Sequence, residues 1–149
     1  MKRTEKYPET LTFHYHNENP RNRITGDCTF RAIARATGKS WIDVVREMAE
    51  LSCETGYAID DKNGIERYME KIGWVKHPQP RKLDNRKYTG EDFCKALMDV
   101  DFRKRYTNSK KNVNLICIMA GHVTCIIDGK INDIWDCSDM CIGNYWTEK

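Results

Sequence analysis

Cys28, His122 and Asp136 supply, in that order along the chain, a nucleophile, a base and a carboxylate. A cysteine nucleophile needs a base to accept its proton, and the base needs a third group that fixes its tautomer and orientation. Cys28 follows Gly26 and Asp27 at the start of an expected helix, where the helix dipole favours a thiolate. We therefore interpret the three residues as a candidate triad, with Asp136 accepting from Nδ1 of His122.

The placement of Asp136 relative to His122 depends on the turn that joins their two strands. Asp128–Gly129 is typical of a two-residue hairpin turn. A strict turn of that kind places His122 opposite Trp135 and sends Asp136 to the other face of the sheet. Asp133 then takes the role of Asp136. A three-residue or five-residue connection, or a bulge, instead places His122 opposite Asp136, so the triad with Asp136 predicts one of these.

The order of these residues resembles that of papain-like cysteine peptidases. There the cysteine begins the first long helix, the histidine begins a late strand, and Asp or Asn lies on the following strand. The segment Gly26–Ile33 carries the cysteine, and Gly121–Val123, Asp128–Lys130 and Trp135–Asp136 carry the rest. In these segments the chain is similar to the small bacterial and phage relatives of that superfamily. The resemblance implies a papain-like fold over most of the chain.

The resemblance also implies an oxyanion hole. In papain-like enzymes an amide side chain six positions before the cysteine helps to hold the oxyanion, and Asn22 stands there in this chain. The family more often has Gln at that position. The backbone amide of Cys28 is the expected second donor. A side-chain donor of this kind lowers a reaction barrier by about 3 kcal/mol.

The implied activity is cleavage of a peptide, isopeptide or related amide bond in a protein or peptide substrate, without a cofactor or metal. Two alternatives stay open, namely a catalytically inactive papain-like domain that binds a protein or peptide, and a thiol acyltransferase with the same triad. A zinc site is disfavoured because its candidate ligands lack the close pairs, such as Cys-x2-Cys, that structural zinc sites usually present. Those candidate ligands are His14, His16, Cys137 and Cys141.

Composition narrows the class of protein. A chain of 149 residues with 40% apolar residues, 32% charged residues and a net charge of +3 predicts one folded domain. The pI near 8.4 argues against a nucleic-acid binder. Met1–Pro20 shows no signal peptide, and the longest apolar run, Leu115–Ala120, is far below the roughly 20 residues of a membrane span. Cysteines inside apolar patterns are typical of reducing compartments, so we expect a cytoplasmic protein.

The apolar spacing changes from helical to alternating along the chain. Helices are expected at Cys28–Gly38, Ser40–Gly56, Ile65–Gly73 and from Thr89 onward, and strands at Val113–Met119, Val123–Ile127, Ile131–Trp135 and Tyr145–Trp146, with a further candidate at Leu11–Tyr15. The basic runs His77–Lys87 and Arg103–Lys111 are interpreted as solvated surface. We therefore predict an α+β domain over residues 1–149, with N-terminal helices packed on a small C-terminal antiparallel sheet.

Overall fold

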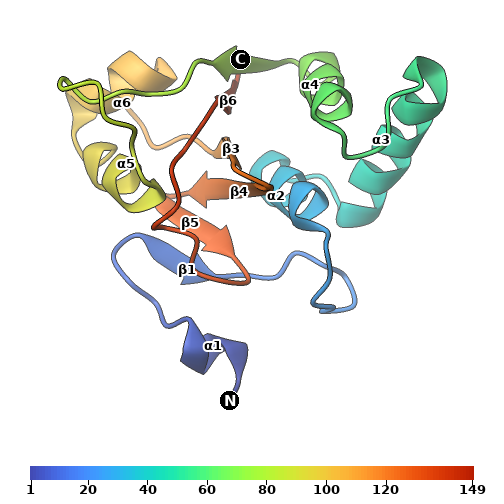
Figure 1. Cartoon of the computed structure of the whole chain (residues 1–149), viewed down its shortest axis with the longest axis horizontal. Helices are drawn as coiled ribbons and strands as arrows, with labels where there is room; N and C mark the ends of the chain where they lie inside the picture. Colours follow the sequence, from blue (N-terminus) through green and yellow to red (C-terminus); the bar gives the residue numbers. More distant parts are fainter.

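A mixed β-sheet of six strands forms the centre of the molecule in the computed structural model, which describes residues 1–149 (Figure 1). The strands are β1 (Phe13–Tyr15), β2 (Trp74–His77), β3 (Leu115–Met119), β4 (His122–Ile127), β5 (Lys130–Asp133) and β6 (Tyr145–Glu148). Their spatial order is β1-β5-β4-β3-β6-β2. The pairing of β1 with β5 is parallel, and all other neighbours are antiparallel. Both edge strands thus precede the central strands in the chain.

Helices cover both faces of this sheet. They are α1 (Arg3–Lys6), α2 (Cys28–Thr37), α3 (Trp41–Thr55), α4 (Lys62–Lys71), α5 (Gly90–Ala96) and α6 (Val100–Thr107). In Figure 1, α2, α3 and α4 lie on one side of the sheet, and α5 and α6 lie on the other. Side chains alternate along the strands accordingly. Ile116 and Cys125 belong to the core under α2–α4, whereas Cys117 and Ile126 belong to the core under α5.

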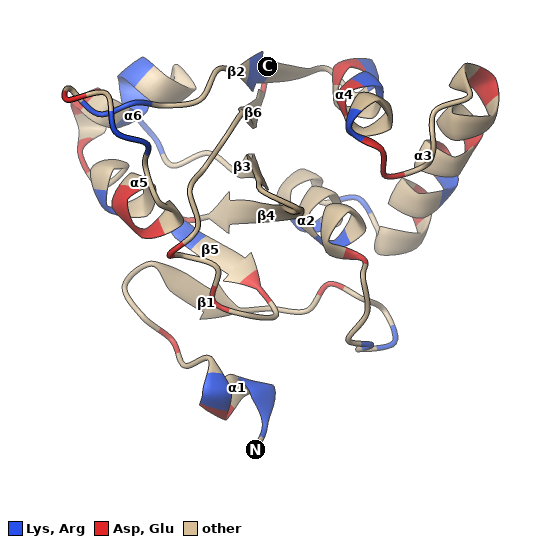
Figure 2. Ribbon diagram, in the orientation of Figure 1, with Lys and Arg blue, Asp and Glu red and all other residues tan.

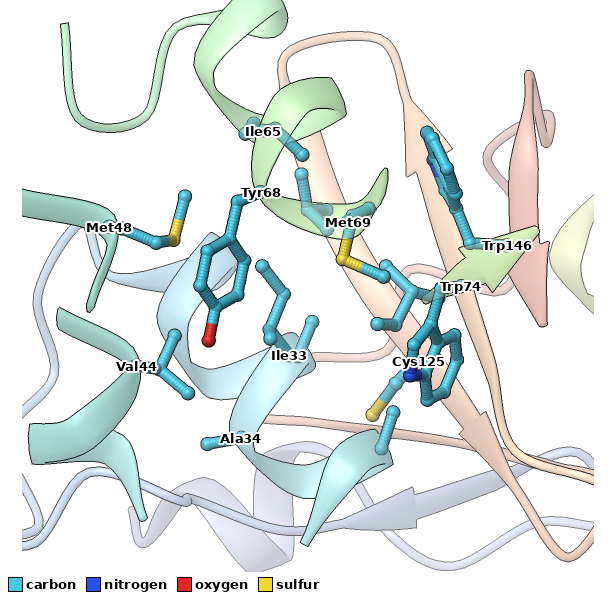
Figure 3. Close-up of a cluster of buried hydrophobic side chains, with 14 of the residues drawn as sticks. Ile33, Ala34, Val44, Met48, Ile65, Tyr68, Met69, Trp74, Cys125 and Trp146 are labelled. Carbon is cyan, nitrogen blue, oxygen red and sulfur yellow. The ribbon is translucent and has the colours of Figure 1, made fainter. Parts of the chain in front are cut away.

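The core under α2–α4 holds α2 against the sheet. Ile33 of α2 lies among Val44 and Met48 of α3 and Tyr68 and Met69 of α4, and all five side chains are buried (Figure 3). Burial of a side chain of this size stabilises the fold by about 1.5–3 kcal/mol. Because helices and sheet enclose α2 together, its first turn has a fixed position relative to β4.

Charged side chains lie on the helices, on the connecting loops and on β2, β5 and β6, whereas β3 and β4 contain no Lys, Arg, Asp or Glu (Figure 2). The two central strands are therefore apolar along most of their length. No helix combines the length and the apolar character that crossing a membrane requires.

Much of the expected organisation is confirmed. The domain is a mixture of helices and strands, and the expected helices at Cys28, Ser40, Ile65 and Thr89 are α2–α5. Ser40 accepts a hydrogen bond from the amide of Asp43 at 3.0 Å, as a helix cap does. Strands also lie where they were expected near Leu11–Tyr15 and Tyr145–Trp146, as β1 and β6.

Three expectations about the elements are wrong. The sheet is neither small nor wholly antiparallel, because β1 and β2 extend it at both edges. β2 and α6 were missed, and the second half of α6 overlaps the stretch Arg103–Lys111 that was interpreted as a solvated basic run. The aromatic side chains of α6, Phe102 and Tyr106, pack against the core under α5. Finally, β5 ends at Asp133 and not at Trp135.

The hairpin between β4 and β5 has the strict two-residue turn. Ile127 pairs with Lys130, and the intervening Asp128 and Gly129 have φ angles of 52° and 76°. Two successive positive φ angles define a type I′ turn, whose twist matches that of the flanking strands. The register therefore brings Asp133, and not Asp136, to the face of the sheet that carries His122.

This turn should control both stability and register. Replacing Gly129 by Val forces a β-branched residue into the left-handed region, so we expect the free energy of unfolding to fall by about 1–2 kcal/mol. Asp128→Asn keeps a residue pair that favours the same turn and should stay within about 0.5 kcal/mol of the unsubstituted protein. Urea unfolding measures both values. Equal stability of the two variants would contradict the turn assignment.

Candidate active site

Cys28 and His122 meet where α2 packs on β4. Cys28 is the first residue of α2, and His122 is the first residue of β4. The half-buried thiol lines the same cleft as His122 and Val123, and it lies close enough to both for them to lower its pKa. The two residues are far apart in the chain, so their contact depends on the packing of α2. The structure thus places the candidate nucleophile and the candidate base in the same cleft.

Asp133 is the carboxylate that contacts the base. Its Oδ2 lies 2.7 Å from Nε2 of His122 and accepts a hydrogen bond from Thr124 Oγ1, also at 2.7 Å. Its Oδ1 accepts from the amide of Ile134 and from Nη1 of Arg31, both at 2.8 Å. Since Nε2 faces Asp133, Nδ1 is the nitrogen left for the thiol, the reverse of the expected assignment.

Asp136 does not take the expected place beside His122. Its carboxylate accepts a hydrogen bond from the amide of Ser138 at 3.0 Å. The strict hairpin turn is the reason, because its register places Asp133 next to His122. Asp136 then lies beyond the end of β5. Trp135 covers the imidazole, with its ring centroid 4.9 Å from that of His122.

Asn22 also differs from its expected role in an oxyanion hole. Its Oδ1 accepts a weak hydrogen bond from Asn17 at 3.3 Å, and its backbone has a φ of 55°. The residue is exposed and does not line the cleft at Cys28. The amide of Cys28 fits the second part of the expectation, since the first N–H groups of a helix have no intrahelical acceptor.

The electrostatics of the site favour an ion pair between thiolate and imidazolium. Burial raises the pKa of Cys28, but hydrogen bonds from His122 and the Val123 backbone outweigh it, so the pKa lies below that of an ordinary thiol. Burial lowers the pKa of His122, but its hydrogen bond to Asp133 dominates and raises the pKa above the ordinary value. Burial likewise opposes ionisation of Asp133, yet its contact with His122 holds the pKa of that carboxyl low.

The other buried cysteines have the opposite tendency. Burial raises the pKa of Cys94 to about 12 and raises the pKa values of Cys117, Cys125 and Cys137. Cys94, Cys117 and Cys125 act as small hydrophobic residues of the core. Cys137 is buried too, but its thiol also donates to Oδ2 of Asp133 at 3.6 Å. Cys28 is therefore the buried or half-buried cysteine whose surroundings favour a thiolate.

A cleft of about 380 Å³ opens onto Cys28 and His122. Apolar side chains of α4, β3 and β6 line it, together with charged side chains at the start of α4 and on β2. The apolar group is Ile65, Ile118, Met119 and Trp146, and the charged group is Asp60, Lys62, Glu66 and Lys76. The site is thus open to a ligand that has both apolar and polar parts.

One group of residues has the donor types of a metal site. Ligand atoms of His122, Asp133 and Cys137 lie within 4.8 Å of one another. Arg31 places a second positive charge on the same carboxylate, at 2.8 Å, and would oppose a cation there. Of the residues weighed as a zinc site from sequence, His14 and His16 contact the carboxylates of Glu9 and Glu18.

Arg31, Thr124 and the α4 side of the cleft were not identified from the sequence. Arg31 carried a usable signal, since it stands four residues after Asp27, a spacing that allows an ion pair along one face of the helix. Thr124 carried no sequence signal of its role beyond its place two residues after His122. Comparison of the chain with protein-family models, curated proteins and solved structures gives no match in any of the three.

The thiol of Cys28 should react with iodoacetamide at about pH 6, where ordinary thiols are almost fully protonated. Cys53 and Cys141 are exposed and serve as internal controls for access. We expect peptide mapping by mass spectrometry to find Cys28 alkylated well before both of them. Faster labelling of the exposed cysteines at this pH would contradict an activated Cys28.

Proposed function

We propose that the protein is a papain-like thiol hydrolase that cleaves a peptide, isopeptide or related amide bond. Cys28 is the nucleophile, His122 the base and acid, and Asp133 the group that orients the imidazole. The observation that carries the proposal is the contact of 2.7 Å between His122 Nε2 and Asp133, on an imidazole that also meets a thiol at a helix N-terminus. These are the roles and relative positions that nucleophilic catalysis by cysteine requires.

The first half of the reaction forms a thioester. The Cys28 thiolate attacks the carbonyl carbon of the substrate, and the resulting oxyanion accepts a hydrogen bond from the amide of Cys28. The C–N bond then breaks as His122 gives its Nδ1 proton to the departing amine. Asp133 keeps its charge throughout and stabilises the imidazolium at the other nitrogen.

The second half returns the free enzyme. Neutral His122 accepts a proton from water, which attacks the thioester carbon, and the C–S bond breaks to release a carboxylic acid and the thiolate. The imidazolium and thiolate then form the starting ion pair again. If an amine replaces water as the acceptor, the same steps make a new amide, so the site also suits an acyltransferase.

The cleft favours a peptide over a small polar molecule as the substrate. Ile65, Met119 and Trp146 offer apolar contact beside the reactive thiol. Lys76 and Glu66 form an ion pair at 3.0 Å on the same cleft, where polar backbone groups of a peptide would find partners. The free thiol state of the seven cysteines supports action in a reducing compartment such as the cytoplasm.

Substitution of the two candidate carboxylates separates their roles. Asp133→Ala should lower kcat/KM by about 100-fold or more, because the imidazole loses the group that fixes it and stabilises its charge. Asp136→Ala removes a carboxylate of the same kind three residues away and should change kcat/KM by less than about twofold. Cys28→Ala should abolish turnover. Loss of activity in Asp136→Ala with a normal Asp133→Ala enzyme would contradict the assignment.

Hydrolysis, transfer and inactive binding give different results in one assay. The protein is mixed with a library of fluorogenic peptides, and the acyl-enzyme on Cys28 is sought by intact-mass measurement after an acid quench. Hydrolysis gives free acid at a rate independent of added amine, whereas transfer gives an amide whose yield rises with amine concentration. Peptide binding without an acyl-enzyme or product would support the inactive binding domain.

A further inference from the structure

Charged groups of alternating sign continue behind the candidate triad. After Cys28, His122 and Asp133 comes Arg31, whose Nη1 lies 2.8 Å from Oδ1 of Asp133. Nε of Arg31 lies 2.7 Å from Oδ1 of Asp27. The side chains of Arg31, Asp27 and Asp133 are 7%, 5% and 2% exposed, so water screens none of these contacts well. We call these five groups the charge row.

Asp27, the last group of the charge row, also accepts hydrogen bonds from two neutral side chains. Oδ2 of Asp27 accepts hydrogen bonds from Nδ2 of Asn19 at 2.9 Å and from Nε1 of Trp41 at 3.0 Å. Asp27 precedes α2 in the chain but does not cap the helix with its side chain. Its carboxylate is directed instead to Arg31, one turn along the helix. The side chain of Asp27, the residue before Cys28, thus pairs with Arg31 and does not cap α2.

Arg31 stands between two carboxylates that both oppose a thiolate. Asp27 is the chain neighbour of Cys28, and Asp133 lies one imidazole away from it. Like charges disfavour ionisation of the thiol, and a buried guanidinium offsets them. Besides its own members, the titratable groups that face the row are Cys137, which contacts Asp133 and His122, and Cys125, which lies near Asp133. Arg35 on α2 and Glu18 before α2 lie near Cys125 and contact no member of the row.

We propose that Arg31 is a positioning residue that sets the pH range in which the Cys28–His122 ion pair exists, with Asp27 as the counter-ion that limits its effect. Arg31 touches neither the thiol nor the imidazole by a hydrogen bond, so it acts through Asp133 and through its charge. The inference rests on the proposed function for its catalytic meaning, although the ion pair is a property of the free protein.

The sign of the effect follows from charge alone. Removal of a positive charge makes every nearby proton harder to lose, so both the thiol and the imidazolium should titrate at higher pH without Arg31. The ion pair exists between these two titrations, and its whole range therefore moves upward. Removal of the negative charge of Asp27 has the opposite sign and moves the range downward.

The test measures two titrations in the full-length chain. The rate of Cys28 alkylation by iodoacetamide against pH reports the thiol, and the imidazole proton shifts in NMR report His122. The variants are Arg31→Gln, Asp27→Asn, the double variant of both, and Arg31→Lys. Arg35→Gln is the matched control, because Arg35 lies one turn further along α2 and contacts Asn132 but neither carboxylate.

Arg31→Gln should raise both titrations by about one pH unit, which makes alkylation below the midpoint about tenfold slower. Asp27→Asn should lower both by a similar amount, and the double variant should return close to the parent protein. Arg31→Lys keeps the charge and should shift by less than half as much. Arg35→Gln should leave both titrations nearly unchanged.

Unchanged midpoints in Arg31→Gln and Asp27→Asn, with lower stability, would overturn the proposal and leave Arg31 a purely structural ion pair. If Arg31→Gln does not fold, the downward shift in Asp27→Asn and the near-parental double variant decide the question. The differences between variants test the role of Arg31, whereas the parent protein's own thiol titration tests the proposed function. An ordinary thiol in the parent protein would thus count against the hydrolase, and the shifts between the variants would still decide on Arg31.

Discussion

The buried carboxylate of Asp133 is the interaction on which the rest of the site depends. It accepts hydrogen bonds from the side chains of Arg31, Thr124 and His122 and from the amide of Ile134. A carboxylate that is 2% exposed is costly to bury, and only such a complete set of donors offsets the cost. Its side-chain donors lie on α2 and β4, and the carboxylate itself lies on β5, so one side chain fixes the relative position of all three elements.

The same contacts join stability to function. Breaking a buried ion pair by removing one partner typically costs about 3–5 kcal/mol, because the remaining charge stays buried and unpaired. The Arg31–Asp133 pair links the helix that begins with Cys28 to the strand beside His122. The hairpin turn at Asp128–Gly129 sets the register of that strand. The geometry of the thiol and the imidazole is therefore determined by residues that do not line the cleft.

Sequence alone predicts most of the helices and the two residues that meet in the site. Cys28 and His122 were identifiable because each begins an element with a clear apolar pattern. The choice between Asp133 and Asp136 depended on whether the turn was strict, and the hypothesis of an odd-length turn was wrong because the Asp128–Gly129 pair adopts its own preferred conformation. The position of α6 was not predictable from charge, since Lys104 and Arg105 are exposed while its aromatic residues pack inward.

The charge row gives a physical reason why the pKa of the half-buried Cys28 thiol is lowered, whereas burial raises the pKa of a thiol such as Cys117. With both partners neutral, the row contains Asp133, Arg31 and Asp27 and carries one net negative charge. Transfer of the Cys28 proton to His122 adds one negative and one positive charge and leaves that net charge unchanged. The transfer therefore redistributes charge within a set of groups already bonded to one another, and each new charge lies beside one of opposite sign. Ionisation of Cys117 would create an uncompensated charge among apolar side chains, which is why burial raises its pKa so far.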